Sequence, residues 1–209
     1  RTSDFLDCFF FAWNMSFEGK GQHERNDRST LRIFSNVLRG KMAEAFFYEK
    51  FNKSLSLSKV NYETYELGTS DKYDFITSQN KKIDVKSLKS FSQMLLLDFE
   101  KVSASIKGDN PNLIKQDVYV IVKVVPDVFE YLKTLSFSNE EEAQKTQLLE
   151  ELSKIDFSCS FCGFVTDEEI KNSIHNNNFL PKGSLINSTS GTPLKKDFIY
   201  IHLNEIYSI

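Results

Sequence analysis

The chain has 209 residues, of which 40% are hydrophobic and 26% charged, with three cysteines and four prolines. This composition excludes collagen-like, coiled-coil, low-complexity and wholly disordered chains, and the length suits one domain with a full hydrophobic core. No stretch approaches the roughly 18 consecutive apolar residues of a membrane span, so we expect no membrane association. Three cysteines are too few for a disulfide scaffold, which favours a cytoplasmic protein. The chain begins with Arg1 rather than methionine, so an upstream segment is a possibility to keep open.

The net charge of −3 is distributed unevenly along the chain. Residues 20–115 hold 17 Lys and Arg against 12 Asp and Glu, a net charge of +5. Residues 116–209 hold 8 against 14, a net charge of −6. A basic segment joined to an acidic one favours a polyanionic partner for the basic segment, although random surface charge is an alternative explanation of this feature alone.

The first half of the chain contains a long helix and a hairpin signal. Residues 1–29 are expected to form an N-terminal extension that ends in a polar loop, and a helix over 30–53 follows, capped by Thr30. Two β-rich runs then flank a polar turn at residues 78–80, which is typical of a hairpin. We expect a further helix over residues 90–106.

The second half is predicted to contain three strands and two helices. The run over 117–125 is nearly all β-branched and apolar, so it should be a strand buried on both faces. Capping boxes that begin at Ser138 and Thr166 predict one helix after each. Strands are expected over 157–166 and 197–203.

This order of elements predicts a single mixed α/β domain, with one central sheet flanked by helices. Residues 30–125 would form its core, and residues 126–209 would complete the sheet.

Two carboxylates are expected to face each other across the hairpin. If the turn is centred on Gln79, antiparallel pairing places Asp74 opposite Asp84, and Lys86 shares a strand face with Asp84. Facing carboxylates repel each other, so the pair makes sense if a cation lies between them. Hard oxygen ligands favour Mg²⁺, with Mn²⁺ as a substitute. The alternative is a pair of solvated aspartates near a turn.

Glu44 is the acidic residue of the long helix that stands out. On a helical wheel it lies off the polar face, close to Ile33, Val37 and Phe51. A carboxylate on a core-facing stripe is costly unless it meets a cation or hydrogen-bond donors, which favours a functional role for Glu44. The alternative is an intrahelical pair with Lys41 or Tyr48.

Residues 37–90 resemble the core of the PD-(D/E)xK nucleases, the fold of restriction endonucleases. The helix RGKMAEAFFYEKF, the YDF segment and the strand IDVKS carry the resemblance, and GFVTDEEI and FIYIHLNEI are similar to later elements of smaller members. The resemblance implies a restriction-endonuclease-like core in which Asp74, Asp84 and Lys86 are catalytic and Glu44 is the acid of the preceding helix. Tyr73 stands where the family name has proline.

The resemblance implies hydrolysis of DNA phosphodiester bonds by a Mg²⁺-dependent endonuclease. Asp74, Asp84, Glu44 and the Val85 carbonyl would hold the metal, and Lys86 would position the attacking hydroxide. We expect a type II restriction endonuclease that cuts a duplex DNA site as a homodimer, with no organic cofactor. A repair or junction nuclease, an RNA-cutting relative and a non-catalytic binding module are the alternatives. Candidates for phosphate contacts are Arg39, Lys41, Lys81, Lys82 and Lys89.

A Cys-Cys-His pattern and a loop histidine are two further candidates for metal binding. Cys159 and Cys162 followed by His175 mimic three zinc ligands, but the fourth is missing, and both cysteines lie in a predicted strand where they would act as small apolar residues. Viral cap-snatching endonucleases place a metal-binding histidine before the helix acid. His23 would match it and favour Mn²⁺ and RNA, whereas a solvated loop histidine is the alternative. We expect His202 to be structural.

Overall fold

The computed structural model describes residues 3–17, 29–64, 73–89, 93–100, 102–103, 116–137, 140–185 and 193–206. The elements in chain order are α1 (Ser3–Ser16), α2 (Thr30–Leu55), β1 (Phe75–Ile76), β2 (Lys82–Leu88), β3 (Met94–Asp98), β4 (Val118–Val125), α4 (Val128–Leu132), α5 (Glu141–Ser153), β5 (Ser158–Thr166), α6 (Asp167–His175), β6 (Phe179–Leu180), β7 (Phe198–His202) and the 3-10 helix η1 (Leu203–Glu205).

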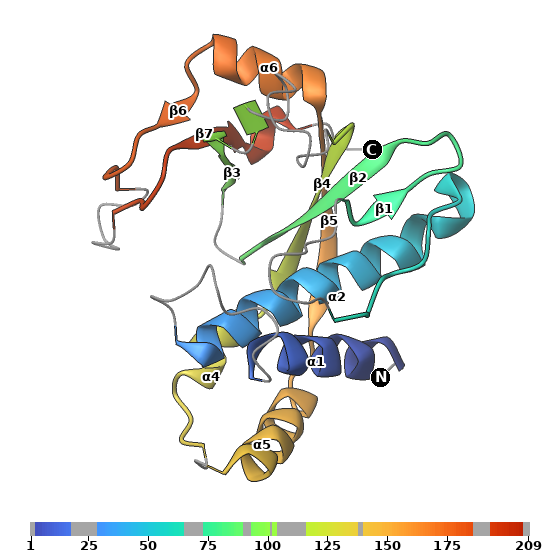
Figure 1. Ribbon diagram of the computed structural model, residues 1–209, viewed down its shortest axis with the longest axis vertical. Helices are drawn as coiled ribbons and strands as arrows, with labels where there is room; N and C mark the ends of the chain where they lie inside the picture. The colour runs from blue at the N-terminus through green and yellow to red at the C-terminus, as the bar shows by residue number, and fades with distance from the viewer. Residues whose placement is uncertain are drawn as a thin grey trace.

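The strands form two sheets rather than the single sheet predicted. A four-stranded sheet has the order β1-β2-β4-β5, in which β2 and β4 are parallel and the other neighbours are antiparallel. A second, three-stranded sheet has the order β3-β7-β6. Figure 1 places this second sheet and α6 in the upper part of the molecule and the helices α1, α2, α4 and α5 in the lower part. The predicted class, α/β with a mixed sheet flanked by helices, is confirmed, but the closing strand β7 pairs with β3 and β6 instead of completing the first sheet.

Strand β4, an inner strand of the four-stranded sheet, is buried on both faces. On one face Val120, Val122 and Val124 belong to a core that they share with α1 and α2. On the other face Tyr119 and Ile121 pack in a second core with β3, β7 and α6. Burial on both faces explains the nearly continuous apolar sequence of β4, as predicted.

Helix α2 positions one side of the candidate site. It begins one residue after Ser29, whose hydroxyl accepts the Arg32 N–H at 3.3 Å, so Ser29 rather than Thr30 is the N-cap. It ends where Ser56 adopts a left-handed backbone with φ 49°. Helix α1, for which the sequence analysis assigned no element, packs along α2 and buries Phe9 and Trp13.

The predicted helix over 90–106 is wrong over Met94–Asp98, which form strand β3. Leu95 and Leu97 alternate into the second core and pair with β7, so tertiary pairing overrides the helical preference of leucine. The described residues 99–100 and 102–103 are helical.

The two predicted capping boxes have different outcomes. The Thr166 box is confirmed at the start of α6, where the Thr166 hydroxyl accepts the Glu169 N–H and the Glu169 carboxylate accepts the Thr166 N–H. Helix α5 begins with Glu140 as its N-cap, and Ser138 lies outside the described residues.

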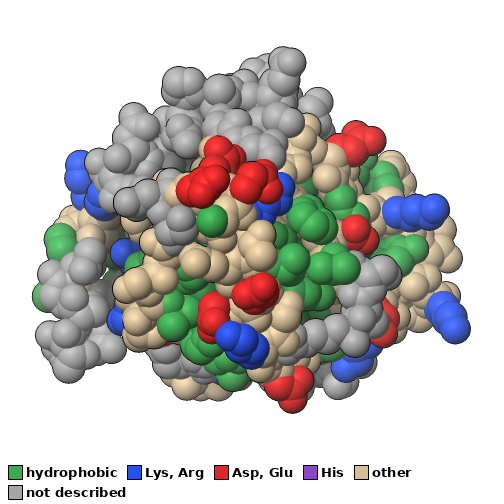
Figure 2. Space-filling model, turned by 90° about the horizontal axis from the view of Figure 1, so that it is seen from below, with side chains coloured by type: hydrophobic (Ala, Val, Ile, Leu, Met, Phe, Trp, Pro, Cys, Tyr) green, Lys and Arg blue, Asp and Glu red, His purple; other side chains and the backbone are tan. Residues whose placement is uncertain are grey.

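Helix α5 is acidic and partly exposed to solvent, as predicted. The helix contains four glutamates, of which Glu141, Glu142 and Glu150 are exposed, and it buries Leu148 and Leu152. Figure 2 views the molecule from the side of α5 and shows acidic side chains in several places around exposed apolar ones. Part of the acidic excess of residues 116–209 therefore lies here. Among the helices of the described residues, none combines the length and apolar character needed to cross a membrane.

Candidate metal centre

The β1–β2 hairpin has the register expected from a turn centred on Gln79. Phe75 pairs with Ile83, and the Thr77 N–H donates to the Lys81 carbonyl at 3.0 Å across the turn. Asn80 closes the turn in a left-handed conformation with φ 61°. Continued by one residue, this register sets Asp74 against Asp84, and the Asp74 N–H donates to the Ile83 carbonyl at 3.0 Å.

Three carboxylates act on one another around Asp74. The Asp74 Oδ2 atom accepts the Val85 N–H at 2.6 Å. Burial raises the pKa of Asp74 well above its usual value, and the carboxylates of Glu44 and Asp84 raise it further. Lys86 and the Val85 N–H lower this pKa, but by less than burial and the two carboxylates raise it. Helix α2 and strand β2 therefore each bring an acidic side chain to the start of β1.

Lys86 is the cation that pairs with Asp84 in this cluster. Its ammonium lies 2.7 Å from both carboxylate oxygens of Asp84 and 5.8 Å from the centre of the Tyr119 ring. Desolvation opposes the charge of Lys86, but Asp84, Asp74 and Glu44 outweigh it and raise its pKa. Lys86 therefore stays protonated at neutral pH.

Glu44 is held by a second, buried lysine. Its Oε2 atom accepts from the Lys41 ammonium at 2.6 Å, and the two side chains are 13% and 5% exposed. Lys41 also donates to the Asn61 carbonyl at 2.9 Å and lies 4.4 Å from the centre of the Phe11 ring. The intrahelical pair of Glu44 with Lys41 is therefore present, and the Glu44 carboxylate also raises the pKa of Asp74.

The donor chemistry of this cluster fits a hard divalent cation. When all three carboxylates are ionised, they outnumber the two ammonium groups by one negative charge. All the donors are oxygen atoms, which suit Mg²⁺ or Mn²⁺. Within the part of the chain that the structure describes, no three Asp, Glu, His or Cys side chains converge into a ready metal-binding group. Two of the three carboxylates are instead held in ion pairs, Glu44 by Lys41 and Asp84 by Lys86. A bound cation would take these oxygens over, and the Val85 carbonyl remains a predicted ligand.

Three of the five proposed phosphate contacts pair with other residues of the fold. Lys41 is buried and pairs with Glu44, so its ammonium has little access to solvent, and its proposed phosphate contact stays a prediction. Arg39 donates to Ser87 Oγ at 3.3 Å, and its pKa is lowered by burial. Lys89 pairs with the buried Asp127 at 3.1 Å. Arg39 and Lys89 therefore join β2 to α2 and α4.

The other two proposed contacts lie at the hairpin. The Lys81 side chain is 59% exposed and lies 3.6 Å from Asp117. The Lys82 N–H donates to Asp117 Oδ2 at 2.9 Å, and its half-buried side chain begins β2. Lys81 and Lys82 remain predicted phosphate contacts.

Tyr119 is a site residue that the sequence analysis missed. It stands beside Asp84 in the parallel β2–β4 register, and its pKa is raised by burial, by Asp84 and by Asp167. The alternation of side chains along β4 places Tyr119 on one face of the sheet. Only the pairing of β2 with β4 shows that Asp84 is its neighbour on that face.

The weaker metal patterns do not assemble in the described residues. Cys159 packs in the core on the α2 side of β5, whereas Cys162 packs in the core on the other side, as strand residues do. His202 contacts the Tyr200 ring edge-on at 5.4 Å between ring centres, consistent with a structural residue. His23 lies outside the described residues.

Comparisons of the chain with family models, curated proteins and solved structures find no match. Its function must therefore be inferred from the chemistry of its own residues.

Proposed function

We propose that this chain is a metal-dependent nuclease that hydrolyses phosphodiester bonds at the cluster of Asp74, Asp84, Glu44 and Lys86. One observation carries the proposal: the Asp74 carboxylate is fixed to the Val85 N–H at 2.6 Å and lies under the influence of two other carboxylates, from β2 and α2. Such an arrangement is costly without a cation, since like charges at close range disfavour the ionised forms.

Asp74, Asp84 and Glu44 would hold Mg²⁺ or Mn²⁺. The bound metal would polarise a phosphate oxygen and lower the pKa of a coordinated water. Asp74 presents its carboxylate in a fixed position, because the Val85 N–H holds one of its oxygens. The residues therefore supply a preorganised anionic cradle, which reduces the reorganisation needed when the substrate arrives.

Lys86 would stabilise the negative charge that develops on the phosphate. A raised pKa keeps its ammonium charged, so it acts as a cation and hydrogen-bond donor rather than as a base. Its side chain is 39% exposed, and its present partner is Asp84. When Asp84 turns to a metal, Lys86 becomes available to the substrate or to the attacking water.

The order of elements supports the likeness to the PD-(D/E)xK nucleases. Helix α2 with its acid is followed by the acidic hairpin, by the Asp84-Val85-Lys86 strand and by the parallel, buried strand β4. On this likeness we propose duplex DNA as the substrate, cleavage at a specific site as in type II restriction endonucleases, and a homodimer, because two-fold symmetry allows both strands to be cut. Lys81 and Lys82 would contact the phosphate backbone.

A non-catalytic nucleic-acid-binding module is the second candidate. The Lys41–Glu44 and Lys86–Asp84 pairs favour it, because they satisfy two of the three carboxylates without a metal. Calorimetry with Mn²⁺ separates the two candidates: a nuclease binds the ion at millimolar concentration, and the binding module does not.

The test of the proposal is cleavage by the purified protein of a panel of phage genomic DNAs, a four-way DNA junction and a structured RNA, each with Mg²⁺ or Mn²⁺. Asp84→Asn should abolish cleavage. Asp98→Asn is the matched control, because Asp98 is another half-buried strand aspartate paired with a lysine, Lys196, in the second sheet. Equal cleavage by wild type and Asp84→Asn would remove Asp84 from the active site.

A further inference from the structure

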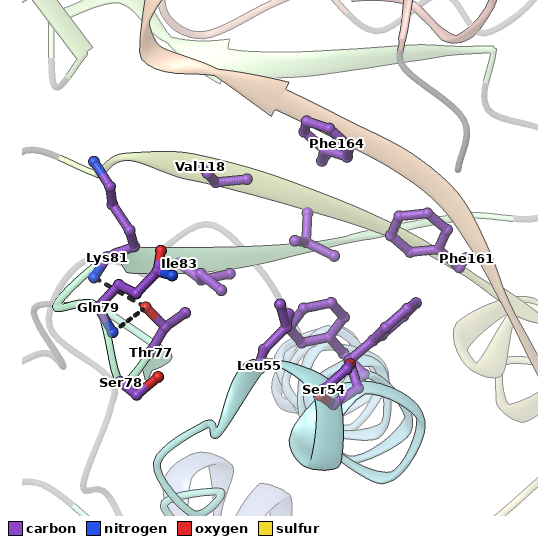
Figure 3. A pocket seen from close by; sticks show the side chains of 13 residues that line it. Ser54, Leu55, Thr77, Ser78, Gln79, Lys81, Ile83, Val118, Phe161 and Phe164 are labelled. Carbon is purple, nitrogen blue, oxygen red and sulfur yellow. Dashed lines mark hydrogen bonds between the residues drawn. The ribbon is translucent and has the colours of Figure 1, made fainter.

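A cavity of about 480 Å³ lies between the C-terminal end of α2, the β1–β2 turn and β5 (Figure 3). Its volume falls within the range of roughly 300–1,000 Å³ that is typical of ligand pockets. Ile83 and Val120 form part of its wall, so it opens on the α2 face of the sheet. Asp84 and Lys86 point to the opposite face, because neighbouring strand residues alternate. The cavity is therefore separate from the candidate metal centre.

One wall of the cavity is aromatic. Phe51 of α2 and Phe161 of β5 meet edge to face with ring centres 5.2 Å apart. Phe164, three residues after Phe161 on β5, also lines the cavity. Phe51, Phe161 and Phe164 are only half-buried, and Leu55 at the end of α2 is 38% exposed. A flat apolar ligand would remove this concave aromatic surface from water, which favours binding.

The opposite end of the cavity is polar. Thr77, Ser78, Gln79 and Lys81 belong to the hairpin turn, and Figure 3 shows them across the cavity from Phe161. The Gln79 amide has both donors and an acceptor. The exposed Lys81 ammonium, 3.6 Å from the half-exposed Asp117 carboxylate, adds a cation that an anionic group can approach from the solvent side. A ligand that fits both ends therefore has a flat aromatic ring with a polar edge and an anionic group.

We propose that this cavity binds a nucleobase, with the base against Phe51, Phe161 and Phe164, and its phosphate near Lys81. An aliphatic chain would cover the rings but would make no polar contact with the Gln79 amide. A sugar phosphate would satisfy Lys81 but would leave the rings exposed. Stacking on aromatic side chains is the usual way in which proteins hold unpaired bases.

The inference rests on the proposed nuclease function in one respect: the base in the cavity would belong to the nucleic-acid strand that is cut at the metal centre. Lys81 precedes Asp84 by three residues, which is roughly 10 Å along the strand. That span is comparable to the axial rise of roughly three nucleotides in one strand of B-DNA. A strand that separates from the duplex beside the metal centre and leaves around the hairpin turn would deliver an unpaired base, a few nucleotides from the cut, to the cavity.

The test is saturation-transfer NMR on the metal-free protein with thymidine 5′-phosphate and, as the base-free probe, 2-deoxyribose 5-phosphate. Ser54→Trp fills the cavity from the last turn of α2, where Ser54 is exposed, without removing a core residue. Ser153→Trp is its matched control, since Ser153 is an exposed serine at the end of α5, outside the cavity. Phe161→Ala removes one wall.

The base protons should receive saturation from wild type and Ser153→Trp, and from Asp84→Ala as well. The signal should fall about ten-fold with Ser54→Trp and Phe161→Ala, in keeping with the usual contribution of base stacking. Equal signals with Ser54→Trp and Ser153→Trp would overturn the proposal. So would the absence of base signals in wild type, or equal saturation of the base-free probe.

These results are independent of the nuclease test. Nucleotide binding without any DNA or RNA cleavage would leave the cavity as a nucleotide site and refute the proposed nuclease. Cleavage without nucleotide binding would support the proposed nuclease and refute the nucleotide site in the cavity.

Discussion

The Asp74 carboxylate accepts the Val85 N–H at 2.6 Å, which ties the first acid of the candidate site to the strand that carries the second. This bond holds Asp74 in a place where burial, Glu44 and Asp84 all disfavour its charge. The position of Asp74 is therefore fixed at a cost in stability when no cation is bound.

Asp74→Asn should stabilise the metal-free protein at neutral and alkaline pH. A carboxyl whose pKa is raised by folding contributes stability below its unfolded pKa, and this contribution is lost as the pH rises through the folded pKa. Asparagine removes the loss, while its amide oxygen still accepts the Val85 N–H. We expect a higher Tm for the variant at pH 8 in EDTA and a difference that shrinks towards pH 4.

Thermal unfolding between pH 4 and pH 8 measures this effect, and Asp98→Asn is the control. Asp98 pairs with Lys196 far along the chain from the site, so its replacement should bring no gain at high pH. A Tm of Asp74→Asn equal to or below that of wild type at pH 8 would contradict the electrostatic picture of the site.

Metal binding should release a proton and strengthen as the pH rises. Because the pKa of Asp74 is raised, a cation must displace a proton from this carboxyl at the lower end of the pH range. Calorimetry with Mn²⁺ in two buffers of different ionisation enthalpy measures the number of protons released. Asp74→Asn should lose the proton release, and an affinity that is the same at pH 5.5 and pH 8 would speak against Asp74 as a ligand.

The part of the site that follows from local periodicity could be predicted from sequence. A turn centred on Gln79 fixes the register of the hairpin and so sets Asp74 against Asp84, and the helical wheel alone places Glu44 off the polar face of α2. These relationships depend on residues that are close along the chain, where strand and helix geometry leave few choices.

The part that depends on distant pairing could not be predicted. Tyr119 meets Asp84 only because β4 pairs with β2 across 35 residues of sequence. Leu95 and Leu97 form a strand only because β7, about 100 residues later, supplies their partners. The inward turn of Lys41 likewise depends on Asn61 and Phe11, which lie on other segments. The aliphatic part of a lysine side chain can lead its ammonium towards the core or towards solvent. The position of Lys41 in the helix therefore does not reveal where its ammonium lies.

Lys41→Met should destabilise the metal-free protein by about 3–5 kcal/mol, because it leaves Glu44 without the buried ammonium that it accepts from. Added Mg²⁺ should recover part of this stability if Glu44 is a metal ligand. Urea unfolding with EDTA or with Mg²⁺ measures both effects. A variant whose stability does not respond to Mg²⁺, beside a wild type that does, would remove Glu44 from the metal site.

Lys81→Ala and Lys82→Ala should each weaken DNA binding and reduce the slope of log K against log salt by about one, as expected for a lost phosphate contact. Lys133→Ala is the control, because Lys133 is a half-exposed lysine that pairs with Glu130 on α4, away from the hairpin. Fluorescence anisotropy of a labelled duplex with Ca²⁺ at several salt concentrations measures the slopes. Slopes equal to that of wild type would place the phosphate backbone elsewhere on the molecule.

Lys86→Met should separate catalysis from metal binding. Lys86 holds both oxygens of Asp84 at 2.7 Å, so its removal frees that carboxylate for a cation, and Mn²⁺ affinity should stay level or rise. Phosphodiester cleavage should nevertheless fall about 10²–10³-fold, because the variant lacks the fixed cation that offsets negative charge in the transition state. Calorimetry and cleavage assays on the same preparation decide the matter. Loss of metal affinity together with activity would show that Lys86 supports the fold of the site rather than the chemistry.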